Sequence, residues 1–187
     1  MTPATRRILV TCALALALAH APASADRLPG RGTLEVSPSL AFSYASFHSN
    51  GTSDFSATTL DLDTYVGYFV DDRLEVGGSA ILSYVSFFGS TTTGGLTGGL
   101  TVNFRSGNYA PYLRASVGFL TGTGYDQTNV LAPILEGGAR VMVGKSASVN
   151  FSAGFRHQLH PGGSPVMDAN TILLGVGVSL FPVRGQE

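Results

Sequence analysis

The chain has 187 residues, of which 44% are hydrophobic and only 12% are charged, and its formal net charge is −1 at pH 7. This length suits one domain, and the nearly neutral charge provides no basic surface for nucleic acid. The low charge and the 24 glycines argue against a coiled coil or a disordered chain. After the first 25 residues no run of 18 apolar residues occurs, which argues against a membrane-spanning helix. A chain poor in charge without such a helix is typical of a membrane β-barrel, whose outward face alone is apolar.

The first 25 residues have the pattern of a secretory signal peptide. Arg6-Arg7 precedes an apolar run over residues 8–19 that is too short to span a bilayer, and Ala23-Ser24-Ala25 forms a small-residue cleavage site. The pattern predicts export, with Asp26 as the first mature residue. Because the single cysteine, Cys12, lies inside the predicted signal, we expect a mature chain without disulfides.

From Thr33 onward, apolar and polar residues alternate with the period of two that indicates β-strands. Eight segments share this alternation, and they are 33–46, 55–70, 74–84, 95–105, 109–120, 131–143, 147–156 and 170–181. Short connections suited to tight hairpins alternate with long ones along the chain. The short connections are 71–73, 106–108 and 144–146, and the long ones surround 48–54, 87–94, 122–129 and 157–168. This rhythm predicts an all-β, eight-stranded antiparallel up-and-down transmembrane β-barrel over residues 33–181. We expect a short flexible lead-in at 26–32 and a C-terminal tail at 182–187.

The charged residues of the predicted strands all stand on the polar face. They are Glu35, Asp61, Asp63, Glu75, Arg105, Arg114, Glu136, Arg140 and Arg156. Since a charge that faces lipid is strongly unfavourable, this segregation indicates that they lie in the barrel interior. We expect ion pairs of Asp61, Asp63 and Glu136 with Arg114 at mid-depth, and of Glu35 and Glu75 with Arg105 and Arg140 near the turns. Eight strands leave a lumen that side chains just fill, so we expect a packed interior and no wide pore.

Aromatic residues on the apolar face fall at two levels. Tyr44, Tyr84, Phe119 and Phe155 stand near the loop ends of the strands, and Tyr68, Phe104 and Tyr109 stand near the turn ends. Two such rings are typical of the aromatic girdles that flank a membrane.

The predicted signal, the eight alternating runs, the loop rhythm and Val178-Ser179-Leu180-Phe181 near the end are the features of a known family. In these features the predicted mature chain resembles the small eight-stranded outer-membrane β-barrels of the OmpA/OmpX type. The resemblance is architectural and implies an integral protein of the outer membrane of a Gram-negative bacterium, in contact with outer-membrane lipid and lipopolysaccharide. Members commonly end on an aromatic residue that the barrel assembly machinery reads, which implies this machinery as a partner. Here Phe181 is followed by residues 182–187.

The expected role is structural, or one of surface interaction through the four long extracellular loops, with an unknown surface ligand. No catalytic residue, metal or cofactor is assigned. Two histidines, His157 and His160, are too few to define a metal site.

One alternative is a hydrolase of lipid A or phospholipid on the same barrel. A family of outer-membrane lipid A deacylases carries a His-x-Ser motif near the membrane rim, and this chain has His157 at a similar place. However, the second residue after His157 is Leu159, so a catalytic cluster would need Ser164 with His157 and Asp168 instead.

A second alternative is a secreted, soluble, lipocalin-like barrel that binds a small apolar ligand. That reading requires apolar side chains inside and polar ones outside. The orientation of the two faces of the strands therefore distinguishes it from a membrane barrel.

Overall fold

A computed structural model of the chain describes residues 30–47, 55–86, 90–104, 108–123, 129–159 and 169–182. The predicted signal peptide, residues 26–29 of the predicted lead-in and residues 183–187 of the predicted tail lie outside these described residues. Among the described residues, no helix is long and apolar enough to cross a membrane.

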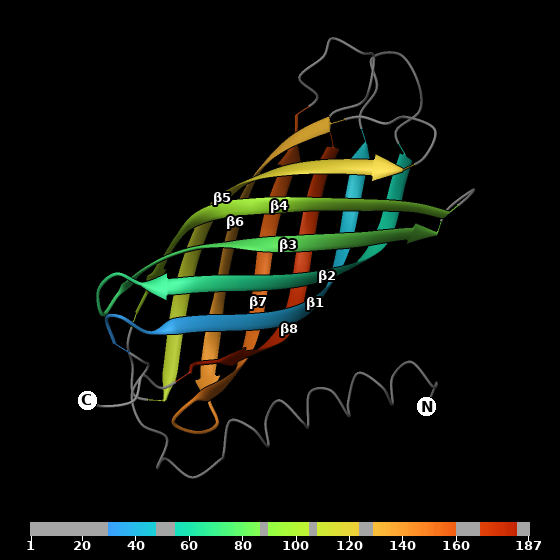
Figure 1. Cartoon of the computed structure of the whole chain (residues 1–187). Coiled ribbons are helices and arrows are strands. Elements are labelled where there is room, and N and C mark those ends of the chain that lie inside the picture. The colour runs from blue at the N-terminus through green and yellow to red at the C-terminus, as the bar shows by residue number, and fades with distance from the viewer. Residues whose placement is uncertain are drawn as a thin grey trace, which may run out of the picture.

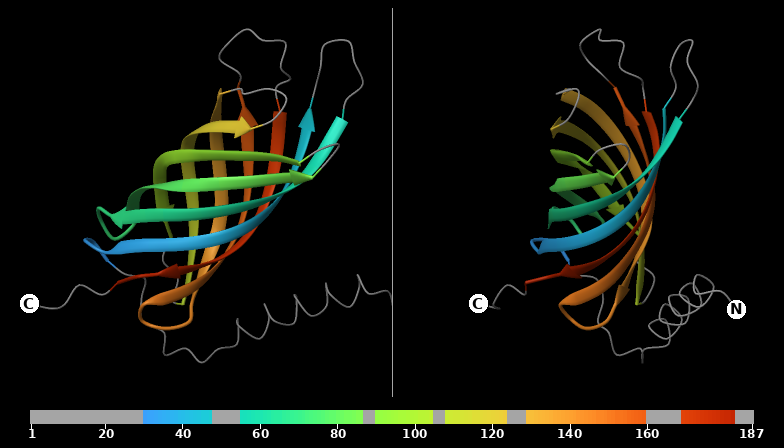
Figure 2. Two further views of the ribbon diagram at one scale, coloured as in Figure 1. Left: turned by 45° about the vertical axis from the view of Figure 1, so that its right-hand side comes forward. Right: turned by 90° about the vertical axis from the view of Figure 1, so that its right-hand side faces the viewer.

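Eight strands form a closed barrel in which every strand pairs antiparallel with its sequence neighbours (Figure 1). They are β1 (Leu34–Phe47), β2 (Phe55–Phe69), β3 (Leu74–Ser86), β4 (Ser90–Asn103), β5 (Tyr109–Thr123), β6 (Asn129–Met142), β7 (Ala147–Gln158) and β8 (Ala169–Leu180). The first strand pairs with the last and closes the wall, which the views in Figure 2 show as one continuous, strongly tilted sheet. The predicted up-and-down topology is therefore confirmed.

The strand boundaries agree with the sequence pattern to within three residues, except at the start of β4. This strand begins at Ser90, whereas the alternation predicted a start at residue 95. The extra residues continue the pairing with β3 as far as Ser86↔Ser90. Residues 90–95 contain serine, threonine and glycine but no aliphatic side chain, so hydrophobic alternation cannot reveal this part of the strand.

The two faces of the wall have opposite polarity. The outward positions expose large apolar side chains, such as Leu96 at 69% and Phe42 at 62%, while Glu35, Glu75 and Arg140 are completely buried inside. A soluble barrel with an apolar lumen needs the reverse arrangement, so this alternative is excluded.

The seam between β1 and β8 has one interruption. Ladder pairs are formed at Val36↔Leu180 and again from Ser39↔Gly177, but not in the described strands at Ser37 and Pro38 between them. Proline has no N–H to donate to a ladder. Side chains bridge the interruption from inside, because the Asn150 amide on β7 donates to Ser37 Oγ at 3.0 Å and to Ser179 Oγ at 2.5 Å.

Asn150→Ala should lower the free energy of unfolding by about 2 kcal/mol, because two buried hydroxyls at the seam lose their donor. Urea unfolding of the refolded barrel in lipid vesicles measures this change. Ser152→Ala, also inward on β7 but without such a role, is the control and should stay within about 0.5 kcal/mol of the parent. Equal losses in the two variants would contradict the proposed bridge.

Candidate functional site

The lumen is closed at the end that carries the short turns. Phe69, Ala110, Met142 and Phe181 form a buried apolar cluster there, none more than 2% exposed. The rings of Phe69 and Phe181 meet edge to face with their centroids 6.3 Å apart. Phe181, which the resemblance marked as an assembly signal, thus points into the lumen of this structure. Together the four side chains form a dry plug, which we call the turn-end plug.

A buried ionic layer lies directly above the turn-end plug. Arg140 Nη2 contacts Glu35 Oε2 at 2.7 Å and Glu75 Oε2 at 3.1 Å, and Arg140 Nη1 donates to Asn103 Oδ1. All four residues are fully buried. The structure thus brings Glu35, Glu75 and Arg140 together, as the sequence suggested, whereas Arg105 lies outside the described residues. Asn103 was missed, although its place on the polar face two residues before Arg105 could have revealed it.

Two inward tyrosines and Arg114 form the next layer. The Arg114 guanidinium lies over the Tyr65 ring at 3.7 Å and within 5.4 Å of the Tyr112 ring. It also forms an ion pair with Glu136 at 3.5 Å, and Tyr112 donates a hydrogen bond to the same carboxylate at 2.8 Å. The cation is therefore held by one carboxylate and by the faces of two aromatic rings.

Glycines on the same strand or on the adjacent strand make room for these two tyrosines. A Cβ on Gly67 or Gly77 would lie 2.6 Å from Tyr65 carbon atoms, and one on Gly138 would lie 2.6 Å from a Tyr112 ring carbon. Tyr65 and Tyr112 were not among the predicted interior residues. The period of two places Tyr65 on the same face as Asp61 and Asp63, and this was the available signal.

A small cavity of about 50 Å³ lies above the tyrosine layer, lined by Asp61, Asp63 and Arg156 among others. Asp61 pairs with Arg156 at 3.5 Å. Asp61 was predicted to pair with Arg114, but Arg114 forms its ion pair with Glu136, its directly paired neighbour across β5 and β6. Two atoms in the cavity wall, Asp63 Oδ1 and Arg156 Nε, have no hydrogen-bond partner among the described residues. The space has room for a few water molecules and for no larger ligand.

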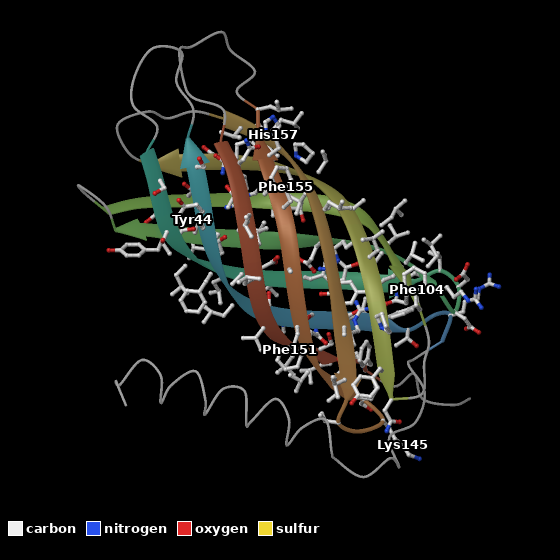
Figure 3. The ribbon with its side chains drawn as sticks, turned by 180° about the vertical axis from the view of Figure 1, so that it is seen from behind. Tyr44, Phe104, Lys145, Phe151, Phe155 and His157 are labelled. Carbon is white, nitrogen blue, oxygen red and sulfur yellow. The ribbon has the colours of Figure 1, made fainter. Side chains whose placement is uncertain are left out.

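The residues predicted for the aromatic girdles are all exposed on the outer face. Tyr44, Tyr84, Phe119, Phe155, Tyr68, Phe104 and Tyr109 are each between 43% and 54% exposed. Figure 3 shows Tyr44 and Phe155 towards the loop end and Phe104 towards the turn end. The outer face therefore has an apolar belt with aromatic residues at both edges.

The candidate catalytic cluster is represented by one described residue. His157 Nδ1 lies 2.8 Å from Asn170 Oδ1, so its described neighbour is an amide and not a carboxylate. His160, Ser164 and Asp168 lie outside the described residues. No group of three or more His, Cys, Asp or Glu side chains in the part of the chain that the structure describes is arranged to hold a metal ion.

Solved structures with the same fold were found, although no family model and no curated protein matches the chain. Neisserial surface protein A has a TM-score of 0.58 at 12% identity and covers 79% of this chain and 96% of its own. The outer membrane protein OprG from Pseudomonas aeruginosa has a TM-score of 0.53 at 14% identity and covers 81% of this chain and 96% of its own. The outer membrane enzyme PagL has a TM-score of 0.54 at 14% identity and covers 76% of this chain and 97% of its own.

The fold is that of the small eight-stranded outer-membrane β-barrels. At these identities the likeness concerns the architecture alone. Because similar proteins include both a surface protein and an enzyme, their fold does not decide a role.

Arg140→Met should lower the free energy of unfolding by about 3–5 kcal/mol, because it leaves two buried carboxylates without their cation. Vesicle-based urea unfolding measures the loss. Adding Glu35→Gln and Glu75→Gln to Arg140→Met should restore much of it by removing the uncompensated charges. If the triple variant were no more stable than Arg140→Met, the charge balance would not be the cause.

Proposed function

We propose that this chain is an integral protein of the bacterial outer membrane, with a closed lumen, that is exported through the periplasm. Its role is structural or is the presentation of the four long extracellular loops to ligands at the surface. The closed turn end carries this proposal, since the turn-end plug and the fully buried layer around Arg140 leave no room for a solute. The exposed apolar belt and the similarity to outer-membrane barrels support the membrane location.

A membrane location also explains the partners that we propose. The apolar belt would contact outer-membrane lipid, and lipopolysaccharide would surround the loop end. The barrel assembly machinery would insert the chain. No nucleic acid and no cofactor enter this function, and we propose that the protein is not an enzyme.

The refolded chain should keep its fold in unheated SDS and shift its mobility on a gel after boiling. A membrane barrel resists SDS because the closed wall leaves no free sheet edge and pairs most of its backbone groups internally. A chain that stays monomeric in buffer without detergent and shows no shift would refute the membrane location.

In a planar bilayer the same protein should show no steady ion conductance, because its lumen is closed. A general porin in the same bilayer provides the positive control. Stable single-channel currents from this chain would overturn the closed-lumen role, even with the gel shift intact.

Incubation of the protein in vesicles with lipid A should release no fatty acid, because we propose no enzymatic role. Release of fatty acid that His157→Ala abolishes would instead favour the hydrolase.

A further inference from the structure

The segment before β1 is attached to the turn between β2 and β3. Gly32 has a positive φ of 85°, and its N–H donates to the Phe69 carbonyl at 2.8 Å. The Phe69 N–H in turn donates to the Thr33 carbonyl at 3.0 Å, and the Arg31 N–H donates to Asp72 Oδ1 at 3.3 Å. The described part of the lead-in, which was predicted to be flexible, is therefore fixed by hydrogen bonds.

A shallow, largely open hollow lies beside this attachment at the turn end of the barrel, lined by Arg31, Asp71, Asp72 and Arg73. Two arginines and two aspartates from two separate segments of the chain thus line this surface, and the charges of Arg73 and Arg31 act on Asp71. The formal charges of the four residues balance. We call this site the turn-end hollow.

Asp71 has a fixed orientation in the turn-end hollow. Its Oδ1 accepts the N–H groups of Arg73 at 2.6 Å and Leu74 at 2.7 Å. These bonds, that of Arg73 first, lower the pKa of the Asp71 carboxyl and keep it ionised. Since both go to Oδ1, and no donor in the described residues contacts Oδ2, this second oxygen can accept from a ligand.

The turn-end hollow also lies at the right depth for a lipid headgroup. Arg31 is three residues before the exposed Leu34, and Arg73 is five residues after the exposed Tyr68 of β2 and three residues before the exposed Val76 of β3. Three residues of chain span at most about 10 Å, so the backbones of Arg31 and Arg73 lie within about 10 Å of the edge of the apolar belt. This is the layer of polar headgroups.

We propose that the turn-end hollow binds a phospholipid headgroup that carries both a phosphate and a primary ammonium, as in phosphatidylethanolamine. Arg31 and Arg73 would hold the phosphate, because guanidinium groups match phosphate oxygens in geometry and charge. Asp71 Oδ2 would accept a hydrogen bond from the ammonium. The balanced charge of the hollow fits a zwitterion better than a net anion. This inference rests on the proposed membrane location.

The test uses the purified, isotope-labelled barrel in maltoside micelles, titrated with dihexanoyl phosphatidylethanolamine, phosphatidylcholine or phosphatidylglycerol. The amide shifts of residues 30–32 and 71–74 report binding. We expect phosphatidylethanolamine to bind about three- to five-fold more tightly than phosphatidylcholine, whose quaternary ammonium has no N–H to donate. Phosphatidylglycerol, which lacks an ammonium, should also bind more weakly.

Two variants separate the roles of the charges. Asp71→Asn retains an Oδ1 acceptor for the turn and should abolish the preference for phosphatidylethanolamine. Arg73→Gln should weaken the binding of all three lipids to the same extent, because all three carry the phosphate. Lys145→Gln, in the turn between β6 and β7, is the matched control and should change neither affinity nor preference.

Equal binding of phosphatidylethanolamine and phosphatidylcholine would overturn the proposed site. Tighter binding of phosphatidylglycerol would also overturn it, in favour of plain attraction of anions. A gel of the same samples, unheated and boiled, keeps the two proposals apart. Loss of the mobility shift would refute the membrane barrel, whereas an intact shift without headgroup preference would refute only this site.

Discussion

Each strand of this barrel separates lipid from a narrow lumen, so every side chain must suit one of two opposite environments. Successive residues of a strand point to opposite faces, and a shift by one residue would move all apolar side chains inward and all charges outward. This constraint explains why the charged residues Glu35, Glu75 and Arg140 are buried inside the wall. It also explains why Leu96 and Phe42 are exposed outside. The strand register, the closure of β1 on β8 and the ionic layers of the lumen all depend on it.

Charged side chains and aromatic rings fill the lumen, and glycines without side chains leave the space that the rings occupy. Arg114 lies on the Tyr65 ring, and this ring occupies the space that Gly67 and Gly77 leave open. A charged residue in a closed lumen needs partners that replace water. Here a carboxylate, two aromatic faces and small neighbours provide them. The many glycines of the sequence are explained in part by this packing.

The sequence predicted the fold well because alternation is a local property that a barrel imposes along its whole length. The alternation of residues along each strand correctly placed Glu35 and Arg140 on the inward face, although their strands are far apart in the chain. The partners across the lumen were harder to predict. Asp61 contacts Arg156 and not Arg114, because the pairing depends on the height of each residue along the tilted strands and on the competing contact with Glu136. The turn-end hollow could not be predicted at all, since the position of Arg31 depends on hydrogen bonds between the backbones of two separate segments.

The interrupted seam between β1 and β8 has a consequence for the order in which the wall is completed. Asn150 and Ser179 are 29 residues apart in sequence, whereas Asn150 and Ser37 are 113 apart. The first contact needs only the hairpin of β7 and β8, and the second needs the first strand to arrive beside the last. The Asn150 amide thus forms hydrogen bonds at two stages of assembly. The first stage is the local pairing of β7 with β8, and the second is the final pairing of β1 with β8. In a barrel that is still open along this seam, Asn150 would already contact Ser179 but not yet Ser37.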